Sequence, residues 1–222
     1  MSGSAAAGAV WPWGPPTGRL RFYLGVMGSG KSALALQVAH HRKRAGRPGM
    51  LMTNADRGGA GRLSSRLGIS SDAVEFDPGT DFGRLLPERI PVRGFVICDE
   101  AQFLTERQVD DLAACVDDLA LDVDCFGLAT AFDSRLFPGS KRLLELADET
   151  VPLQVEVLCW CGEPGRINAR LENGTVARAG GQVAVGDVLL DGSGATYRVL
   201  CRRHWRAGDP GPGLDDVPLL GL

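Results

Sequence analysis

The sequence predicts an α/β protein: a mostly parallel, RecA-like P-loop sheet flanked by helices, followed by a small β-rich subdomain that carries zinc. Three observations indicate this fold. Residues 25–32 read G-x-x-x-x-G-K-S, the pattern of a phosphate-binding loop, between a short apolar strand and a helical segment. Further along, short apolar runs alternate with helical patterns, as they do in proteins with parallel sheets. After residue 157 the chain is punctuated by glycine and holds two Cys/His pairs.

Apolar runs place the strands, and a 3.6-residue periodicity places the helices. In residues 105–121, Val109, Leu112 and Val116 fall on one helical face, and Thr105 suits the start of the helix. We expect strands at 20–24, 50–53, 95–98, 123–128 and 151–158, and helices at 33–44, 105–121 and 141–147. In such a sheet ligands bind at the carboxyl ends of the strands, so the loops after these strands should form one site.

The chain of 222 residues is long enough for one such domain and a small appendage. We expect a disordered tail at 1–18, a P-loop domain at 19–156, a zinc subdomain at 157–205 and a flexible tail at 206–222. A net charge of −3 provides no basic field and argues against a protein that coats DNA or RNA. No apolar run could span a bilayer and no secretory signal is evident, so we expect a cytoplasmic protein with reduced cysteines.

The glycine loop predicts a phosphate site through its chemistry. Glycines let backbone amides approach phosphate oxygens, and the helix that follows adds its positive end. Lys31 can reach the β- and γ-phosphates, and Ser32 can hold Mg²⁺. We therefore expect ATP to bind the whole loop: Gly25, Val26, Met27, Gly28, Ser29, Gly30, Lys31 and Ser32.

Two acidic residues follow the apolar strand at 95–98. Asp99 occupies the Walker B position, which holds Mg²⁺ together with the loop serine. Glu100 can then take a proton from an attacking hydroxyl group or water. The alternative is that Glu100 is an ordinary acid at a helix entry, because Walker B strands of hydrolases also end in Asp-Glu.

Two short pairs predict a zinc site in the subdomain. Cys159 and Cys161 form a C-x-C pair, and Cys201 and His204 form a C-x-x-H pair. Three thiolates and one imidazole suit tetrahedral Zn²⁺, although C-x-C is tighter than the usual spacing. The alternative is two unrelated buried thiols and a surface histidine. The remaining cysteines are most simply core residues: Cys98, Cys115 and Cys125.

Together these motifs resemble the type II thymidine kinases, and the resemblance runs from about residue 19 to residue 205. It rests on G-x-M-x-S-G-K-S at 25–32, D-E-A-Q-F at 99–103, Gly127-Leu128 followed by Phe132 and Phe137, and the Cys pair followed by Tyr197 and C-R-R-H at 201–204. The resemblance implies transfer of the ATP γ-phosphoryl group to the 5′-hydroxyl of thymidine. It also implies Mg²⁺, a structural Zn²⁺ and a homotetramer.

The resemblance further implies roles for individual residues. Glu100 would be the general base, and Asp99 would serve Mg²⁺. The phosphate donor would also contact Asp56, Arg57, Gln102 and Arg170. The nucleoside would lie against Met27, Phe103, Leu128, Phe132, Phe137 and Tyr197, under a lasso loop at Val185, Gly186 and Asp187 whose backbone reads the thymine edge. The zinc would tie the base of that lasso to the main sheet.

Some positions depart from the family pattern. Val26 and Gly28 stand where Pro and Phe are usual, and Gly28 removes an aromatic wall. The family's D-x-R appears as Asp56-Arg57, one residue short, and its Asp-x-Asp-Phe segment appears at 129–132 as Ala-Thr-Ala-Phe. These changes leave the phosphoryl chemistry intact and bear on the selectivity of the nucleoside pocket.

We therefore expect a kinase with ATP and thymidine as its partners and deoxyuridine as a second acceptor, and we expect neither membrane nor nucleic acid as a partner. The alternative is a P-loop ATPase in which Glu100 activates water, coupled to a zinc ribbon whose neighbouring arginines bind nucleic acid. Phe132 and Phe137 could instead fill the core, but their polar surroundings in the sequence favour a pocket.

Overall fold

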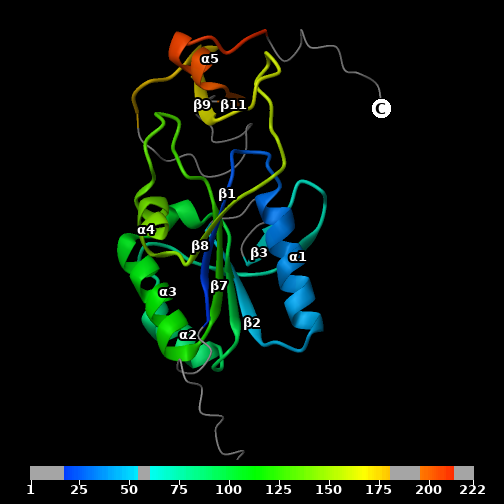
Figure 1. Ribbon diagram of the computed structural model, residues 1–222, viewed down its shortest axis with the longest axis vertical. Helices are drawn as coiled ribbons and strands as arrows, with labels where there is room; N and C mark the ends of the chain where they lie inside the picture. The colour runs from blue at the N-terminus through cyan, green and yellow to red at the C-terminus, as the bar shows by residue number, and fades with distance from the viewer. Residues whose placement is uncertain (1–17, 55–60, 181–195, 213–222) are drawn as a thin grey trace, which may run out of the picture.

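A six-stranded sheet forms the centre of the protein (Figure 1). The structure is a computed structural model and describes residues 18–54, 61–180 and 196–212. In the spatial order β5-β2-β6-β7-β1-β8, the strands are Val74–Glu75, Gly49–Thr53, Phe95–Cys98, Asp122–Gly127, Leu20–Leu24 and Glu149–Pro152. Every pair of neighbours in this sheet is parallel, which confirms the predicted fold class.

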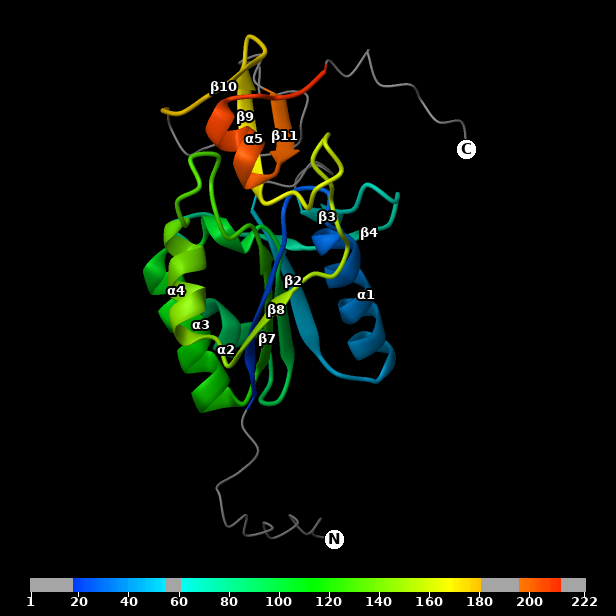
Figure 2. The same cartoon turned by 45° about the horizontal axis from the view of Figure 1, so that its top comes forward.

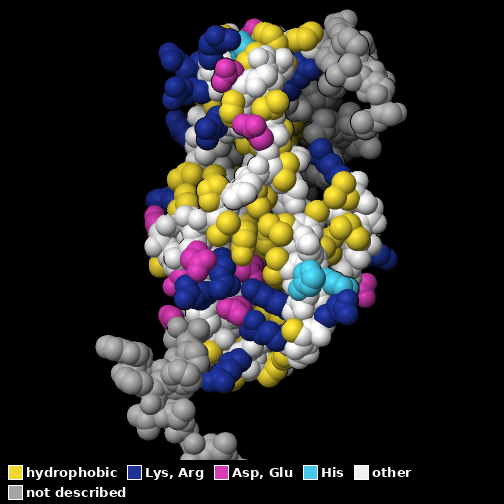
Figure 3. Space-filling view, turned by 45° about the vertical axis from the view of Figure 1, so that its right-hand side comes forward, with side chains coloured by type: hydrophobic (Ala, Val, Ile, Leu, Met, Phe, Trp, Pro, Cys, Tyr) yellow, Lys and Arg dark blue, Asp and Glu magenta, His cyan; other side chains and the backbone are white. Residues whose placement is uncertain are grey.

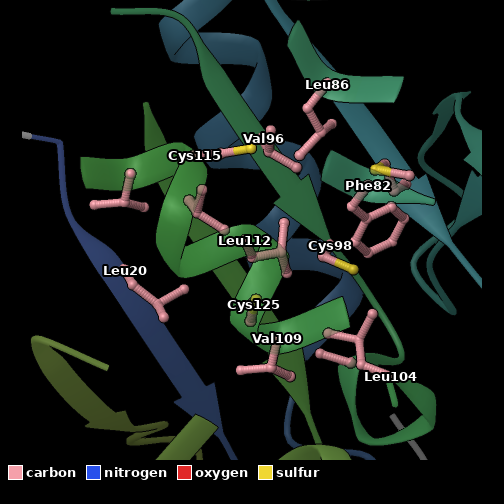
Figure 4. Packing of buried hydrophobic residues seen from close by; sticks show 14 of the residues in the cluster. Leu20, Phe82, Leu86, Val96, Cys98, Leu104, Val109, Leu112, Cys115 and Cys125 are labelled. Carbon is pink, nitrogen blue, oxygen red and sulfur yellow. The ribbon is translucent and has the colours of Figure 1, made fainter. Parts of the chain in front are cut away.

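Helices cover both faces of the sheet (Figure 1). One face carries α1 (Lys31–Arg44), and the other carries α2 (Phe82–Arg89), α3 (Glu106–Leu119) and α4 (Pro138–Leu146). Because both faces are covered, the central strand β6 is apolar along its length, and all four of its residues are buried. Figure 4 shows the larger core, in which Phe82, Val96 and Leu112 belong to one buried cluster.

Most expected elements are confirmed, with small shifts at their ends. β1 and β6 have the predicted bounds. α3 begins after Thr105, which forms a capping box with Gln108 and so satisfies two backbone N–H groups at the helix start. α4 begins at Pro138, earlier than the predicted residue 141, because proline suits the first turn of a helix.

The strand predicted at 151–158 is wrong beyond Pro152. β8 ends there, and the Leu153 N–H still donates to the Leu24 carbonyl oxygen at 2.9 Å. At the next residue, Gly25, the chain of β1 turns away into the glycine loop. Since β8 is an edge strand, residues 154–157 lose their pairing partner at this point.

The segment between β2 and β6 contains elements that apolar patterns did not indicate. They are β3 (Arg62–Ser64), β4 (Ser70–Asp72), β5 and α2. β4 reads Ser-Ser-Asp and shows no apolar alternation, while α2 contains Pro87. α2 begins instead with a cap, because the Asp81 side chain accepts a hydrogen bond from the Arg84 N–H.

A second, antiparallel sheet stands over the carboxyl ends of the main sheet (Figure 2). It has the order β10-β9-β11, with bounds Thr175–Val176, Ile167–Glu172 and Thr196–Leu200, and α5 (Arg202–Ala207) follows it. These elements form the β-rich subdomain that the glycine-punctuated sequence indicates.

The predicted tails fall mainly outside the described residues: the first is described only at Gly18, and the second only as far as residue 212. In the described part of the chain, no helix combines the length and the apolar character needed to cross a membrane.

Candidate active site and metal site

The glycine loop connects β1 to α1 at the carboxyl edge of the main sheet. Gly28 and Gly30 have φ angles of 78° and 83°, a left-handed backbone that favours glycine. At Gly25 an added Cβ would lie 2.4 Å from Ser29 Oγ, so this close approach also requires glycine. The loop thus has the turns that let successive backbone amides face an anion at the start of a helix.

Lys31 and Ser32 are the first two residues of α1. The Lys31 ammonium lies over the loop, because Nζ donates to the carbonyl oxygens of Gly25 and Val26 at 3.2 and 3.0 Å. The Ser32 hydroxyl lies beside the carboxylate of Asp99. The cation and the hydroxyl that the motif assigns to a triphosphate and its metal therefore meet at this edge.

Asp99 follows β6 and is 1% exposed. Within the described residues, neither of its carboxylate oxygens accepts a hydrogen bond of ordinary geometry. The hydroxyl groups of Ser29 and of Thr53, at the end of the neighbouring β2, are likewise buried without a partner. Such atoms are rare in folded proteins, and several at one edge indicate a place for a polar ligand. Carboxylate and hydroxyl oxygens suit Mg²⁺, which retains part of its water shell.

The protonation of Asp99 follows from its surroundings. Burial, and then the neighbouring charge of Glu100, raise the pKa of Asp99 from 3.8 to about 7, while the Ser32 hydroxyl and the Lys31 ammonium partly offset the rise. A bound divalent cation would favour the ionised form, so metal and proton compete for this side chain.

Glu100 stands at a strained point of the backbone. Its φ angle is 54°, in the left-handed region that non-glycine residues seldom adopt. The side-chain amide of Gln102 donates to Oε2 of Glu100 at 2.5 Å, and Oε1 of Gln102 accepts from the Leu128 N–H at 3.0 Å. Gln102, which is predicted to contact the phosphate donor, therefore bridges the proposed base and the loop after β7. Strain of this kind collects at functional sites.

An apolar cluster adjoins the glycine loop and contains four of the predicted nucleoside contacts. Leu128 and Phe137 are buried with Ala131, and Met27 and Phe103 pack against them. The rings of Phe103 and Phe137 meet edge to face, with centroids 5.9 Å apart. The interpretation of Phe137 as the wall of an apolar pocket agrees with this packing.

A cavity of about 330 Å³ joins this cluster to the phosphate loop. Its lining includes Met27, Lys31, Ser32, Glu100 and Leu128. Cationic, acidic and apolar groups thus face one space, which is the arrangement of a site for a polar ligand with an apolar part.

Phe132 and Arg170 lie against each other, although the family resemblance places Phe132 beside the nucleoside and Arg170 beside the phosphate donor. The Arg170 guanidinium sits 4.4 Å from the centroid of the Phe132 ring, and Arg170 also pairs with Glu172. Trp205 Nε1 donates to the Phe132 carbonyl oxygen at 3.0 Å. Tyr197 lies in β11 opposite Arg170 of β9. Phe132 therefore belongs to the contact between the two sheets, and the apolar cluster forms without it.

The predicted metal ligands converge in the subdomain. One ligand atom from each of Cys159, Cys161, Cys201 and His204 lies within 4.8 Å of all the others. The Cys159 and Cys201 sulfurs are each 3.5 Å from His204 Nδ1, and the Cys161 and Cys201 sulfurs are 4.0 Å apart. A zinc tetrahedron with sulfur ligands has edges of about 3.8 Å, so the cluster is compatible with Zn²⁺.

The C-x-C pair lies in a tight turn, and the strand predicted to run up to residue 158 ends well before it, at Pro152. The Cys159 N–H donates to the Glu163 carbonyl oxygen at 2.8 Å, and the Gly162 N–H donates back to Cys159 at 2.9 Å. Gly162 has a φ angle of 85°, which permits this turn. The intervening Trp160 stacks on the His204 ring, with centroids 4.3 Å apart. The short spacing is therefore accommodated by backbone that folds around the ligand set.

Some of the predicted site residues lie outside the described residues: Asp56, Arg57 and the proposed lasso residues at 185–187. The structure also shows two residues near the site that sequence reasoning missed. Asn168 was missed, although a polar residue between Ile and Ala in a strand is a signal of a buried partner. Arg66, in the β3–β4 turn, lines the cavity next to the glycine loop, and no motif in the sequence marks it.

Comparison with known proteins places the whole assembly in context. The model of the family described as thymidine kinase matches residues 18–205. The chain belongs to the thymidine kinase family. A thymidine kinase of Streptomyces coelicolor is 50% identical over 190 residues, which cover 84% of this chain and 88% of that protein. Thymidine kinases of Cutibacterium acnes and Ruegeria pomeroyi are 48% and 40% identical, over 86% and 87% of this chain and 90% and 97% of theirs.

Membership in the thymidine kinase family confirms the resemblance that the motifs indicate. The family match includes both the phosphate loop and the four Cys/His residues, so both sheets belong to one family unit. The family and its curated relatives identify the chain as an enzyme, a thymidine kinase. They do not favour the alternative, an ATPase attached to a nucleic-acid-binding zinc ribbon.

Loss of one metal ligand tests the zinc site. We expect about one zinc per chain in the purified protein and a large loss of zinc in Cys161→Ser, because a three-ligand site binds the metal far more weakly. Elemental analysis measures the ratio. Cys115→Ser, which removes a thiol from α3, is the control and should keep its zinc. A wild-type protein that folds and works without zinc would contradict the assignment.

The raised pKa of Asp99 predicts a pH dependence of Mg–ATP binding. Asp99 is mostly neutral below about pH 7 and mostly ionised above it. Because only the ionised form can hold Mg²⁺, affinity should be about tenfold weaker at pH 6 than at pH 8. Calorimetric titration over this range measures it. Asp99→Asn reports the slope that ATP itself contributes, and equal slopes in both proteins would refute the assignment.

Proposed function

We propose that this chain is a thymidine kinase that transfers the γ-phosphoryl group of ATP to the 5′-hydroxyl of thymidine. The observation that carries the proposal is the cavity of about 330 Å³, whose lining combines Lys31 and Ser32 with Glu100 and the apolar Met27 and Leu128. A donor and an acceptor held in one cavity react without the entropic cost of meeting in solution.

The donor side of the site handles charge. The amides of residues 25–32 and the Lys31 ammonium cradle the phosphates. Ser32 and Asp99 would hold Mg²⁺, which when bound neutralises charge on the β- and γ-phosphates. Contacts of Asp56, Arg57 and Arg170 with the donor are proposed on the family pattern alone.

Glu100 acts as the general base in this proposal. The Gln102 amide holds Oε2 of Glu100, which leaves Oε1 for the 5′-hydroxyl group. The 5′-oxygen forms a bond to the γ-phosphorus while the bond from that phosphorus to the β,γ-bridging oxygen breaks. The hydroxyl proton passes to Glu100, and the products are ADP and dTMP.

The apolar cluster receives the base of the nucleoside. Thymine would pack against Met27, Phe103, Leu128 and Phe137, with Tyr197 and the backbone at 185–187 closing the pocket as the family pattern implies. Among the described residues, a Cβ added at Gly28 would come within 4 Å of atoms of Arg66 and Val157 alone, both 3.9 Å away. On the family pattern, deoxyuridine is the proposed second acceptor.

A homo-oligomer, a tetramer on the family pattern, is the proposed state. Hydrophobic side chains gather across the middle of the face shown in Figure 3. Leu67, Ile69 and Val155 are 79%, 50% and 59% exposed around a groove between α1 and the edge strand β8. Apolar patches and free strand edges are usually covered by another chain. Static light scattering of the full chain measures the mass directly.

The cytoplasm is the proposed compartment. All six cysteines are free thiols in the structure, and a reducing compartment keeps them available as core residues and metal ligands.

A nucleoside panel with ATP labelled in the γ-phosphate tests the function. We expect label on thymidine, less on deoxyuridine, and little on ribonucleosides or purine nucleosides. Label released only as free phosphate would support an ATPase instead. Glu100→Gln should bind ATP at least as tightly as the wild type, because it removes a charge that raises the pKa of Asp99. It should lower kcat by about 10²–10⁴-fold, because a positioned base contributes that much. Glu106→Gln, an exposed acid in α3, serves as the matched control.

A further inference from the structure

We propose that Asn168 is a positioning residue that ties the phosphate loop to the Cys/His subdomain, so that metal occupancy of this subdomain sets how tightly the loop holds a triphosphate. The inference rests on the proposed binding of ATP by residues 25–32. Asn168 touches neither substrate in this proposal and acts through the backbone of Met27.

The contact itself is short and sheltered. The backbone N–H of Met27, in the middle of the glycine loop, donates to Oδ1 of Asn168 at 2.7 Å. Asn168 is 4% exposed and comes from β9, 141 positions further along the chain. An amide that is partly buried costs free energy when it loses its acceptor, so this bond resists opening. By comparison, the loop's bond from the Gly25 N–H to Gly127 is 3.4 Å long.

Asn168 is joined to the metal ligands through its own strand. Its neighbour Ala169 packs in one buried cluster with Cys159, Leu200 and Cys201. In the β9–β11 register Asn168 lies opposite Val199, and Ile167 lies opposite Leu200, which immediately precedes the ligand Cys201. A metal that draws the four ligands together therefore also fixes β9, and with it the position of the Asn168 amide.

Met27 transmits the position of Asn168 to both halves of the reaction. Its backbone belongs to the phosphate loop, and its side chain packs against the cluster of Leu128, Ala131 and Phe137. A shift of Met27 moves the loop amides and the apolar wall together. The contacts of Trp205 and Arg170 with Phe132 reach the loop after β7 and not the phosphate loop.

The link is tested by measuring ATP affinity with and without zinc. Calorimetry with Mg–ATP and no nucleoside is run on the full chain, loaded with zinc and after selective removal of zinc in excess Mg²⁺. The variants are Asn168→Leu, which has similar size and no acceptor, and Asn168→Asp, which keeps an acceptor oxygen. Thr175→Val, which removes a side-chain hydrogen bond of β10 away from the loop, is the control.

We expect zinc removal to weaken ATP binding about tenfold in the wild type, the size of effect that follows from the loss of one hydrogen bond to a partly buried amide. Asn168→Leu should bind ATP about tenfold more weakly even with zinc, and should then change little when zinc is removed. Asn168→Asp and Thr175→Val should show the wild-type ratio. Because each protein is compared with itself, the charge that Asn168→Asp adds does not enter the ratio.

Other outcomes overturn the inference. A zinc-loaded Asn168→Leu protein that binds ATP as tightly as the wild type refutes it. It is also refuted if zinc removal weakens ATP binding equally in the wild type and in Asn168→Leu. If the wild type binds no ATP, the proposed function fails instead. Elemental analysis and circular dichroism confirm zinc content and folding. If Asn168→Leu does not fold, Asn168→Ala replaces it. If chelation causes aggregation, Cys161→Ser takes the place of zinc removal, and ATP affinity is compared in Cys161→Ser alone and combined with Asn168→Leu or Asn168→Ala.

Discussion

A buried carboxylate without an ordinary hydrogen-bond partner organises the site. Asp99 directly follows β6 and is 1% exposed, and no described group satisfies its oxygens with a bond of ordinary geometry. An isolated buried charge is among the most costly groups in a folded protein. Here the cost is placed where a bound divalent cation would offset it. The same edge of the sheet gathers the glycine loop, Lys31 and the start of α1, and the remaining parts of the molecule are arranged around it.

The two sheets divide the work between them. The main sheet supplies rigid strand ends for charge and phosphate, while the small sheet covers those ends and is itself held by a compact Cys/His cluster. Among the described residues, polar contacts join the two sheets at Met27 with Asn168 and at Trp205 with Phe132. The small sheet therefore reaches both the phosphate loop and the loop after β7.

Local signals made most of the fold predictable, and contacts distant in sequence account for what was missed. The phosphate loop, β6 with Asp99, and the capped helix α3 each carry their pattern within a few residues. The strand predicted after Pro152 fails because its partner β1 turns away at Gly25, a fact of tertiary pairing. The family resemblance assigned Phe132 to the nucleoside, and the guanidinium that lies over its ring comes from β9, a contact that no local pattern indicates. Asn168 escaped notice because its partner is a backbone amide far away in the chain.

The left-handed backbone of Glu100 limits what evolution can place there. Residues that adopt this conformation at little cost, such as glycine, asparagine and aspartate, have no carboxylate or one that is shorter by a methylene group. Glutamate has the reach but costs about 1–3 kcal/mol in a conformation of this kind, and a β-branched side chain would cost more. Drift at this position is therefore constrained twice, by geometry and by chemistry. Glycine would relieve the backbone strain at this position but would remove both the carboxylate and its bond to Gln102.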